Sequence, residues 1–133
     1  MKQTEHVNES AKIESLLNEL NKKQKFPFPK AGNKLCVPID QGVYIIRNPK
    51  DEVAHVGRTV GGAKGLFQRL NNHMHGASSF VIQHLKGDGS KLRNGWTYQL
   101  LIVKEPRSRA LLEHLATAKH CPKHLGLSKK IKD

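Results

Sequence analysis

Residues 42–58, which read GVYIIRNPKDEVAHVGR, decide the fold of this chain. The segments 42–47 and 53–58 are rich in β-branched and aromatic residues, a composition typical of strands. Asn48-Pro49-Lys50-Asp51 between them has the residues of a turn. Because the connection is so short, the stretch predicts an antiparallel β-hairpin.

Helical patterns follow the hairpin. Gly61-Gly62 interrupts the chain, and a helix is then predicted that ends at Gly76. One face of it carries the apolar residues Leu66, Phe67, Leu70 and Met74. Ser78 or Ser79 is expected to cap a shorter helix that runs to Leu85, because serine accepts hydrogen bonds from the first turn.

The end of the chain adds a strand and a helix. Residues 96–104 read as a strand, and the consecutive apolar residues 100–103 favour a central position with both faces covered. Ser108 is expected to cap a final helix whose apolar stripe comprises Leu111, Leu112 and Leu115. Cys121-Pro122 should end that helix.

Before the hairpin, residues 9–23 read as an amphipathic helix with Ile13, Leu16, Leu17 and Leu20 on one side. Two prolines then predict a linker over 24–36 with Phe26 and Phe28 as anchors. The sum is an α+β fold, a small three-stranded antiparallel sheet flanked by helices, plus the N-terminal helix. We expect an N-terminal helix and linker at 1–36, one globular domain at 37–127 and a basic tail at 128–133.

The charge balance points to a polyanionic partner. The 133 residues include 23 Lys and Arg against 11 Asp and Glu, a formal net charge of +12. Basic side chains that neutralise phosphates release counterions, so nucleic acid is favoured over a solvated basic surface. No apolar run approaches a membrane span, and the polar N-terminus lacks a signal core. We therefore expect no membrane partner and a cytoplasmic location.

Five features stand in order along the chain. They are GVY at 42–44, HVG at 55–57, Arg69 and His73 four apart on one helix face, and Glu113 in the last helix. Together they resemble the GIY-YIG nuclease superfamily from about Gly42 to about Gly126, and the Arg–His pair is most similar to its restriction-enzyme branch. The resemblance implies a metal-dependent endonuclease that hydrolyses phosphodiester bonds in DNA, with Mg²⁺ or Mn²⁺ as cofactor.

The resemblance also implies roles for single residues. Tyr44 would lie near the attacking water, Arg69 would steady the phosphate, His73 would assist proton transfer, and Glu113 would hold the metal. Arg58 and Lys64 are expected to bind substrate and, with Arg69 and a protonated His73, to lower the pKa of the Tyr44 phenol. Gly57 fits a place where the backbone comes close to another group.

Several alternatives stay open. His55 stands where the family has its second tyrosine, so the chain is either an active nuclease or an inactive nucleic-acid-binding or assembly module. His120-Cys121-Pro122-Lys123-His124 could seed a zinc site, although no second close pair of ligands exists. Any sequence specificity would come from the helix at 9–23, from residues 77–95 or from a homodimer.

Overall fold

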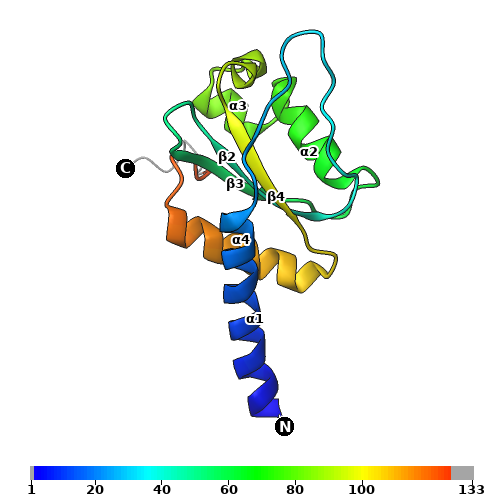
Figure 1. Ribbon diagram of the computed structural model, residues 1–133, viewed down its shortest axis with the longest axis vertical. Helices are drawn as coiled ribbons and strands as arrows, with labels where there is room; N and C mark the ends of the chain where they lie inside the picture. Colours follow the sequence, from blue (N-terminus) through cyan, green and yellow to red (C-terminus); the bar gives the residue numbers. More distant parts are fainter. Residues whose placement is uncertain (1, 127–133) are drawn as a thin grey trace.

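The computed structural model describes residues 2–126, with side chains from Asn8 onward. The predicted basic tail at 128–133 lies outside the described residues. Along the chain the elements are α1 (Lys2–Lys22), β1 (Phe26–Pro27), β2 (Gly42–Arg47), β3 (Val53–Arg58), α2 (Gly65–Met74), α3 (Ser79–His84), the 3-10 helix η1 (Gly89–Arg93), β4 (Thr97–Ile102) and α4 (Pro106–His120). The predicted α+β class is confirmed, and so is the N-terminal helix (Figure 1).

The sheet is antiparallel with the strand order β1-β4-β2-β3. The predicted hairpin forms β2 and β3, and β4 occupies the predicted internal position. The sequence did not predict β1, in which Phe26 and Pro27 pair with Tyr98 and Thr97. Proline cannot donate to a ladder, so this short strand suits the sheet edge that it occupies.

Two apolar clusters lie on opposite faces of the sheet. Along β2 the side chains alternate, so Tyr44 and Ile46 pack in the cluster that includes residues of α2 and α3. Val43 and Ile45 pack in the other cluster, with residues of α1 and α4. The fold is therefore three layers, with the sheet between two helical layers (Figure 1). Within residues 2–126, no helix combines the length and the apolar character needed to cross a lipid bilayer.

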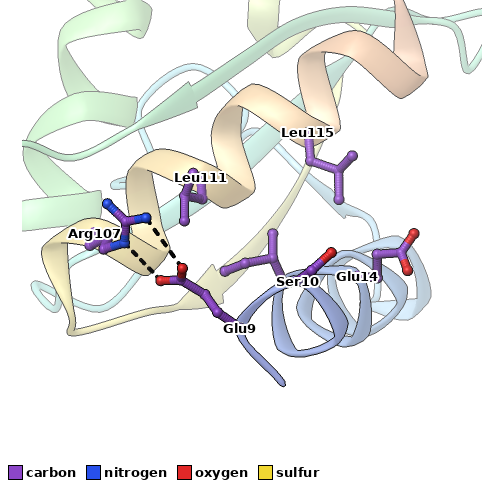
Figure 2. A pocket seen from close by; sticks show the side chains of 7 residues that line it. Glu9, Ser10, Glu14, Arg107, Leu111 and Leu115 are labelled. Atoms are coloured by element: carbon purple, nitrogen blue, oxygen red, sulfur yellow. Dashed lines mark hydrogen bonds and ion pairs between the residues drawn. The ribbon is translucent and has the colours of Figure 1, made fainter. Parts of the chain in front are cut away.

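Besides the apolar packing of Ile13, Leu17 and Leu20, helix α1 is joined to β4 and to α4 by side-chain hydrogen bonds. At its C-terminal end the buried amide of Gln99 donates to the carbonyls of Leu20, Asn21 and Lys23, which a helix end leaves without intrahelical partners. Nearer the N-terminal end of α1, Arg107 of α4 donates to the Glu9 carboxylate at 2.7 and 3.2 Å (Figure 2). A groove of about 330 Å³ lies between the two helices there.

One expectation for α4 was wrong in detail. Glu105, and not Ser108, caps the helix, because its carboxylate accepts from the backbone N–H groups of Arg107 and Ser108. Ser108 instead donates its hydroxyl to Glu105 at 2.7 Å. Leu111 lines the groove and is only partly buried, whereas Leu112 is fully buried.

Candidate active site

The Tyr44 hydroxyl lies at the centre of the candidate site. Its ring is fully buried, and its oxygen is 2.8 Å from Nε2 of His73 on α2. Gly57 pairs with Tyr44 across the hairpin, and a Cβ at Gly57 would collide with the phenol. The expected close approach at Gly57 is thus confirmed, because only glycine leaves room for the Tyr44 ring over the neighbouring strand.

His73 is held on its other side by α3. Its Nδ1 is 2.6 Å from the hydroxyl oxygen of Ser78, which also accepts from the backbone N–H of Val81 and so caps α3. Burial, with a smaller contribution from the charge of Arg69, lowers the pKa of His73 to about 3. The ring is therefore neutral at physiological pH, and it joins the cap of α3 to the Tyr44 hydroxyl.

A β-bulge places His55 beside these rings. Val53 pairs with Arg47 and His55 with Ile46, so Ala54 is the extra residue on β3. As a result Ala54 and His55 both lie toward α2 and α3. The His55 ring stacks on Phe80 with centroids 4.7 Å apart, and its centroid is 5.2 Å from that of His73.

His55 is uncharged in these surroundings. Burial lowers its pKa to about 2, and the neighbouring histidines and Arg69 add to the effect. Its Nδ1 lies 3.2 Å from Nδ1 of His124. The sequence predicted no role in this site for His124, yet its ring contacts His55 directly.

Arg58 and Glu113 come together from β3 and α4. Nη1 of Arg58 is 2.5 Å from Oε1 of Glu113, and both side chains are partly exposed. Glu113 also lines a cleft of about 270 Å³ together with His55 and His124. The cleft opens at the β3 edge of the sheet, where residues from the two helical layers meet.

Arg69 lies close enough to influence all three buried rings. Its charge lowers the pKa values of Tyr44, His55 and His73. Its Nε is buried and has no hydrogen-bond partner among the described residues.

The expectation that nearby cations lower the Tyr44 pKa below its ordinary value was wrong. Burial raises the pKa of Tyr44 to about 12, and the opposing effect of Arg69 is smaller. His73 carries no positive charge that could help, because its own pKa is lowered to about 3. Tyr44 is thus a neutral phenol at physiological pH.

Lys64 stands apart from this group. It is exposed at the N-cap position of α2, and no hydrogen bond or ion pair joins it to the other candidate residues in the described part of the chain. The histidine–cysteine segment 120–124 forms no metal centre either. Among the side chains described from Asn8 to Gly126, no three His, Cys, Asp or Glu residues are grouped to hold a metal ion.

Two further residues hold His124, and the sequence carried no local signal for either contact. Nε2 of His124 is 2.7 Å from Oε1 of Gln83 on α3. The backbone N–H of His124 donates to the carbonyl of Ala54, the bulge residue, at 2.9 Å. The segment after α4 thus returns to the β3 edge, a long-range contact that residue spacing does not encode.

The buried neutral imidazoles make acid pH destabilising. His55 and His73 have an ordinary pKa of 6.5 in the unfolded chain and about 2 and about 3 in the folded protein. Between these values the unfolded chain binds more protons, so stability is full above pH 6.5 and is lost as pH falls toward 3. Below pH 6.5, each ring should lower the free energy of unfolding by roughly 1.4 kcal/mol for every pH unit of acidification. The two rings together should lower it by roughly 4 kcal/mol at pH 5.

Urea unfolding at pH 7, 6 and 5 measures this loss. His55→Phe should reduce the pH dependence of the unfolding free energy by about half, because a phenyl ring packs on Phe80 without titrating. His75→Phe is the control, since His75 is exposed. Equal unfolding free energies at pH 7 and pH 5 would show that the rings are not buried and neutral.

No family model and no curated protein matches the sequence significantly. Among solved structures, the fold is similar to the crystal structure of the GIY-YIG N-terminal endonuclease domain of UvrC from Thermotoga maritima, which is bound to its catalytic divalent cation, magnesium. The two chains are 25% identical, with a TM-score of 0.49. The match covers 67% of this chain and 86% of the other.

Proposed function

We propose that the chain is a GIY-YIG-type, metal-dependent endonuclease that hydrolyses phosphodiester bonds in DNA. One observation carries the proposal: β2, β3, α2 and α4 bring a tyrosine, two histidines, an arginine and a carboxylate to one edge of the sheet. These are the residues that the family resemblance singled out. The proposed catalytic unit comprises residues 37–127. We place it nearest to the restriction-enzyme branch of the superfamily, and we propose that the protein acts in the cytoplasm.

Glu113 would hold Mg²⁺ or Mn²⁺. A single carboxylate beside an open cleft fits Mg²⁺, which binds through one or two carboxylates plus substrate phosphates and keeps several waters. The ion would supply relief of the negative charge that develops on the phosphate and a template for the reacting oxygens. The carboxylate is paired with Arg58 in this structure, so that pair must open for the carboxylate to serve as a ligand.

The other residues bind the phosphate and manage the proton. The guanidinium of Arg69, whose buried Nε has no partner among the described residues, binds a phosphate oxygen, and Arg58, once released from Glu113, binds a second one. Tyr44 keeps its proton and orients the attacking water through its hydroxyl, since its pKa of about 12 makes it a poor base. His73 fixes that hydroxyl, and His55 accepts a hydrogen bond in the cleft.

Nicking of supercoiled plasmid DNA tests this function. With Mg²⁺ or Mn²⁺ the purified protein should convert supercoiled plasmid to nicked circles, and EDTA should stop the reaction. A heat-unfolded sample reveals only those contaminating nucleases that survive heating. A variant of a proposed site residue, purified in the same way, is therefore the sharper control. Failure to nick with either metal, while DNA is still bound, would overturn the enzymatic proposal.

A second function is favoured by two observations. Arg58 occupies the Glu113 carboxylate, and His55 replaces a tyrosine in the family pattern. Both suit a chain that has lost cutting and serves as a nucleic-acid-binding or assembly module. Binding without nicking separates this reading from the first.

DNA affinity should depend steeply on salt under either reading. Each phosphate that a Lys or Arg neutralises should contribute about −0.9 to the slope of log affinity against log salt. Arg69→Ala and Lys64→Ala should each reduce the slope by about one. Lys12→Ala is a matched control, because Lys12 lies on α1 across the sheet from α2.

Fluorescence anisotropy of a labelled duplex from low to high salt measures the slope. A flat dependence would exclude phosphate binding, and with it both the nuclease and the nucleic-acid-binding module. If Lys12→Ala reduces the slope as much as Arg69→Ala, the DNA does not lie along the α2 side.

A further inference from the structure

We propose that His124 and Gln83 form a hydrogen-bonded relay that fixes the tautomer of His55, with the proton on Nδ1 and a free lone pair on Nε2. In this role His124 is a positioning residue, since it acts on the cleft through His55. The consequence for catalysis rests on the proposed nuclease function. The tautomer itself does not.

The relay begins at Gln83. Oε1 of its side-chain amide lies 2.7 Å from Nε2 of His124. A carbonyl oxygen can only accept a hydrogen bond, so Nε2 of His124 must carry the proton and donate it. A neutral imidazole has one N–H and one bare nitrogen, which leaves Nδ1 of His124 as an acceptor.

The protonation state of His124 in turn determines that of His55. Nδ1 of His124 is 3.2 Å from Nδ1 of His55. Two bare nitrogens at this distance would gain nothing, so Nδ1 of His55 carries the hydrogen and donates. Nε2 of His55 is then bare. Both rings are neutral, because burial lowers the pKa of each imidazole.

Backbone hydrogen bonds position the segment that carries His124 beside β3. The N–H of His124 donates to the carbonyl of Ala54, and the N–H of Lys123 donates to the carbonyl of Val53. Ala54 is the bulge residue that turns His55 toward α2 and α3. The same edge of β3 therefore sets the position of both rings, and Gln83 sets the direction of the hydrogen bonds.

The resulting tautomer changes what His55 presents. A tyrosine at this place would offer an O–H donor to the cleft, whereas His55 in the relay offers a lone pair. His55 lines the same cleft as Glu113, and its Nε2 makes no hydrogen bond to another described residue. In the proposed nuclease, Nε2 would accept a hydrogen bond from a water in that cleft and orient it.

Nitrogen NMR of the protein labelled with ¹⁵N-histidine reads the tautomer directly. Without metal or DNA, His55 should show a protonated Nδ1 and a bare Nε2, with His124 the reverse. Gln83→Leu removes the acceptor at an exposed position, so it should not disturb folding. It should shift the His55 tautomer ratio about five- to tenfold toward Nε2–H, the form a free imidazole side chain favours.

Gln83→Glu is the matched rescue, because a carboxylate still accepts from His124 and the Nδ1–H form of His55 should return. His124→Phe keeps a ring against Phe80 and should release His55 as Gln83→Leu does. If His55 of the wild type carries its proton on Nε2, or if Gln83→Leu leaves the ratio unchanged, the relay is wrong.

Nicking assays separate this inference from the proposed function. Gln83→Leu should lower the nicking rate, and Gln83→Glu should restore it. A wild type that shows the Nδ1–H tautomer but never nicks supports the relay and overturns the nuclease. A wild type that nicks with His55 protonated on Nε2 supports the nuclease and overturns the relay.

Discussion

Replacing Glu113 with glutamine is expected to abolish nicking while leaving DNA binding intact or tighter. Stabilisation of transition-state charge by a bound divalent ion amounts to several kcal/mol, so loss of the carboxylate should slow nicking by about 10³-fold or more. The variant should still bind DNA, because removal of one negative charge beside the cleft reduces repulsion of phosphate.

The substitution should not unfold the protein. The glutamine oxygen can still accept from Arg58, and the partly exposed ion pair that it replaces is worth about 1 kcal/mol or less. Plasmid nicking, duplex binding and Mn²⁺ binding by calorimetry, measured on the same preparation, give the three readouts. Glu19→Gln is the control, since Glu19 is an exposed carboxylate on α1.

Unchanged nicking by purified Glu113→Gln would remove Glu113 from the site. Loss of Mn²⁺ binding together with loss of nicking would instead support the assignment. Loss of DNA binding as well would mean that the Arg58–Glu113 pair is structural, because release of Arg58 alone should favour phosphate binding.

Local patterns in the sequence were sufficient to predict the hairpin and the helix face shared by two residues of the candidate site. Residues 42–47 and 53–58 are strands as predicted, because β-branched and aromatic composition and turn residues encode a hairpin within 17 positions. The four-residue spacing of Arg69 and His73 placed both on one side of α2. The full burial of the His73 side chain was not predictable from residue spacing, since it depends on how residues of α3 pack against it.

Contacts between distant segments were beyond the reach of local patterns. A two-residue strand such as β1 has no periodicity, and it exists only because β4 offers an unpaired edge. The bulge at Ala54 depends on the register between β2 and β3, which no single strand reveals. His124 attracted attention only as a metal ligand, whereas its partners are Gln83 and His55.

Burial also reverses the charge state that the sequence suggested. A basic chain with neighbouring Arg58, Lys64 and Arg69 predicted a lowered Tyr44 pKa. The fold places Tyr44 at zero exposure, and the desolvation of its charged form outweighs the nearby guanidinium. The chemistry that remains available to Tyr44 is therefore hydrogen bonding rather than proton abstraction.

Replacement of His55 tests whether the imidazole has taken over the function of the tyrosine. His55→Phe keeps the aromatic stack on Phe80 and removes both ring nitrogens. If the bare Nε2 orients the attacking water, His55→Phe should lower the nicking rate by roughly 10- to 100-fold, because loss of one hydrogen bond in a buried site costs about 1–3 kcal/mol. His55→Ala should lose at least as much, because it also opens a hole beside Phe80.

The pH profile distinguishes an acceptor from an ordinary histidine base. With a folded-state pKa of about 2, His55 stays neutral at every pH where the protein is folded. Wild-type nicking should therefore show no inflection near pH 6.5, the ordinary pKa of histidine. An inflection there that disappears in His55→Phe would mean that the ring is solvated and charged in part, contrary to the structure.

Three outcomes for His55 lead to different conclusions. If the wild type nicks and His55→Phe nicks equally well, His55 only fills space against Phe80, and the water must be held by Tyr44. If the wild type never nicks and His55→Tyr gains cutting, the histidine is the change that silenced the site. In the third outcome, the nicking rate falls in His55→Phe and is retained in Gln83→Glu, while both variants keep the duplex affinity and the urea midpoint of the wild type at pH 7. That result assigns the loss to the Nε2 lone pair. Neither packing against Phe80 nor contact with DNA would explain that combination, because both are retained in His55→Phe.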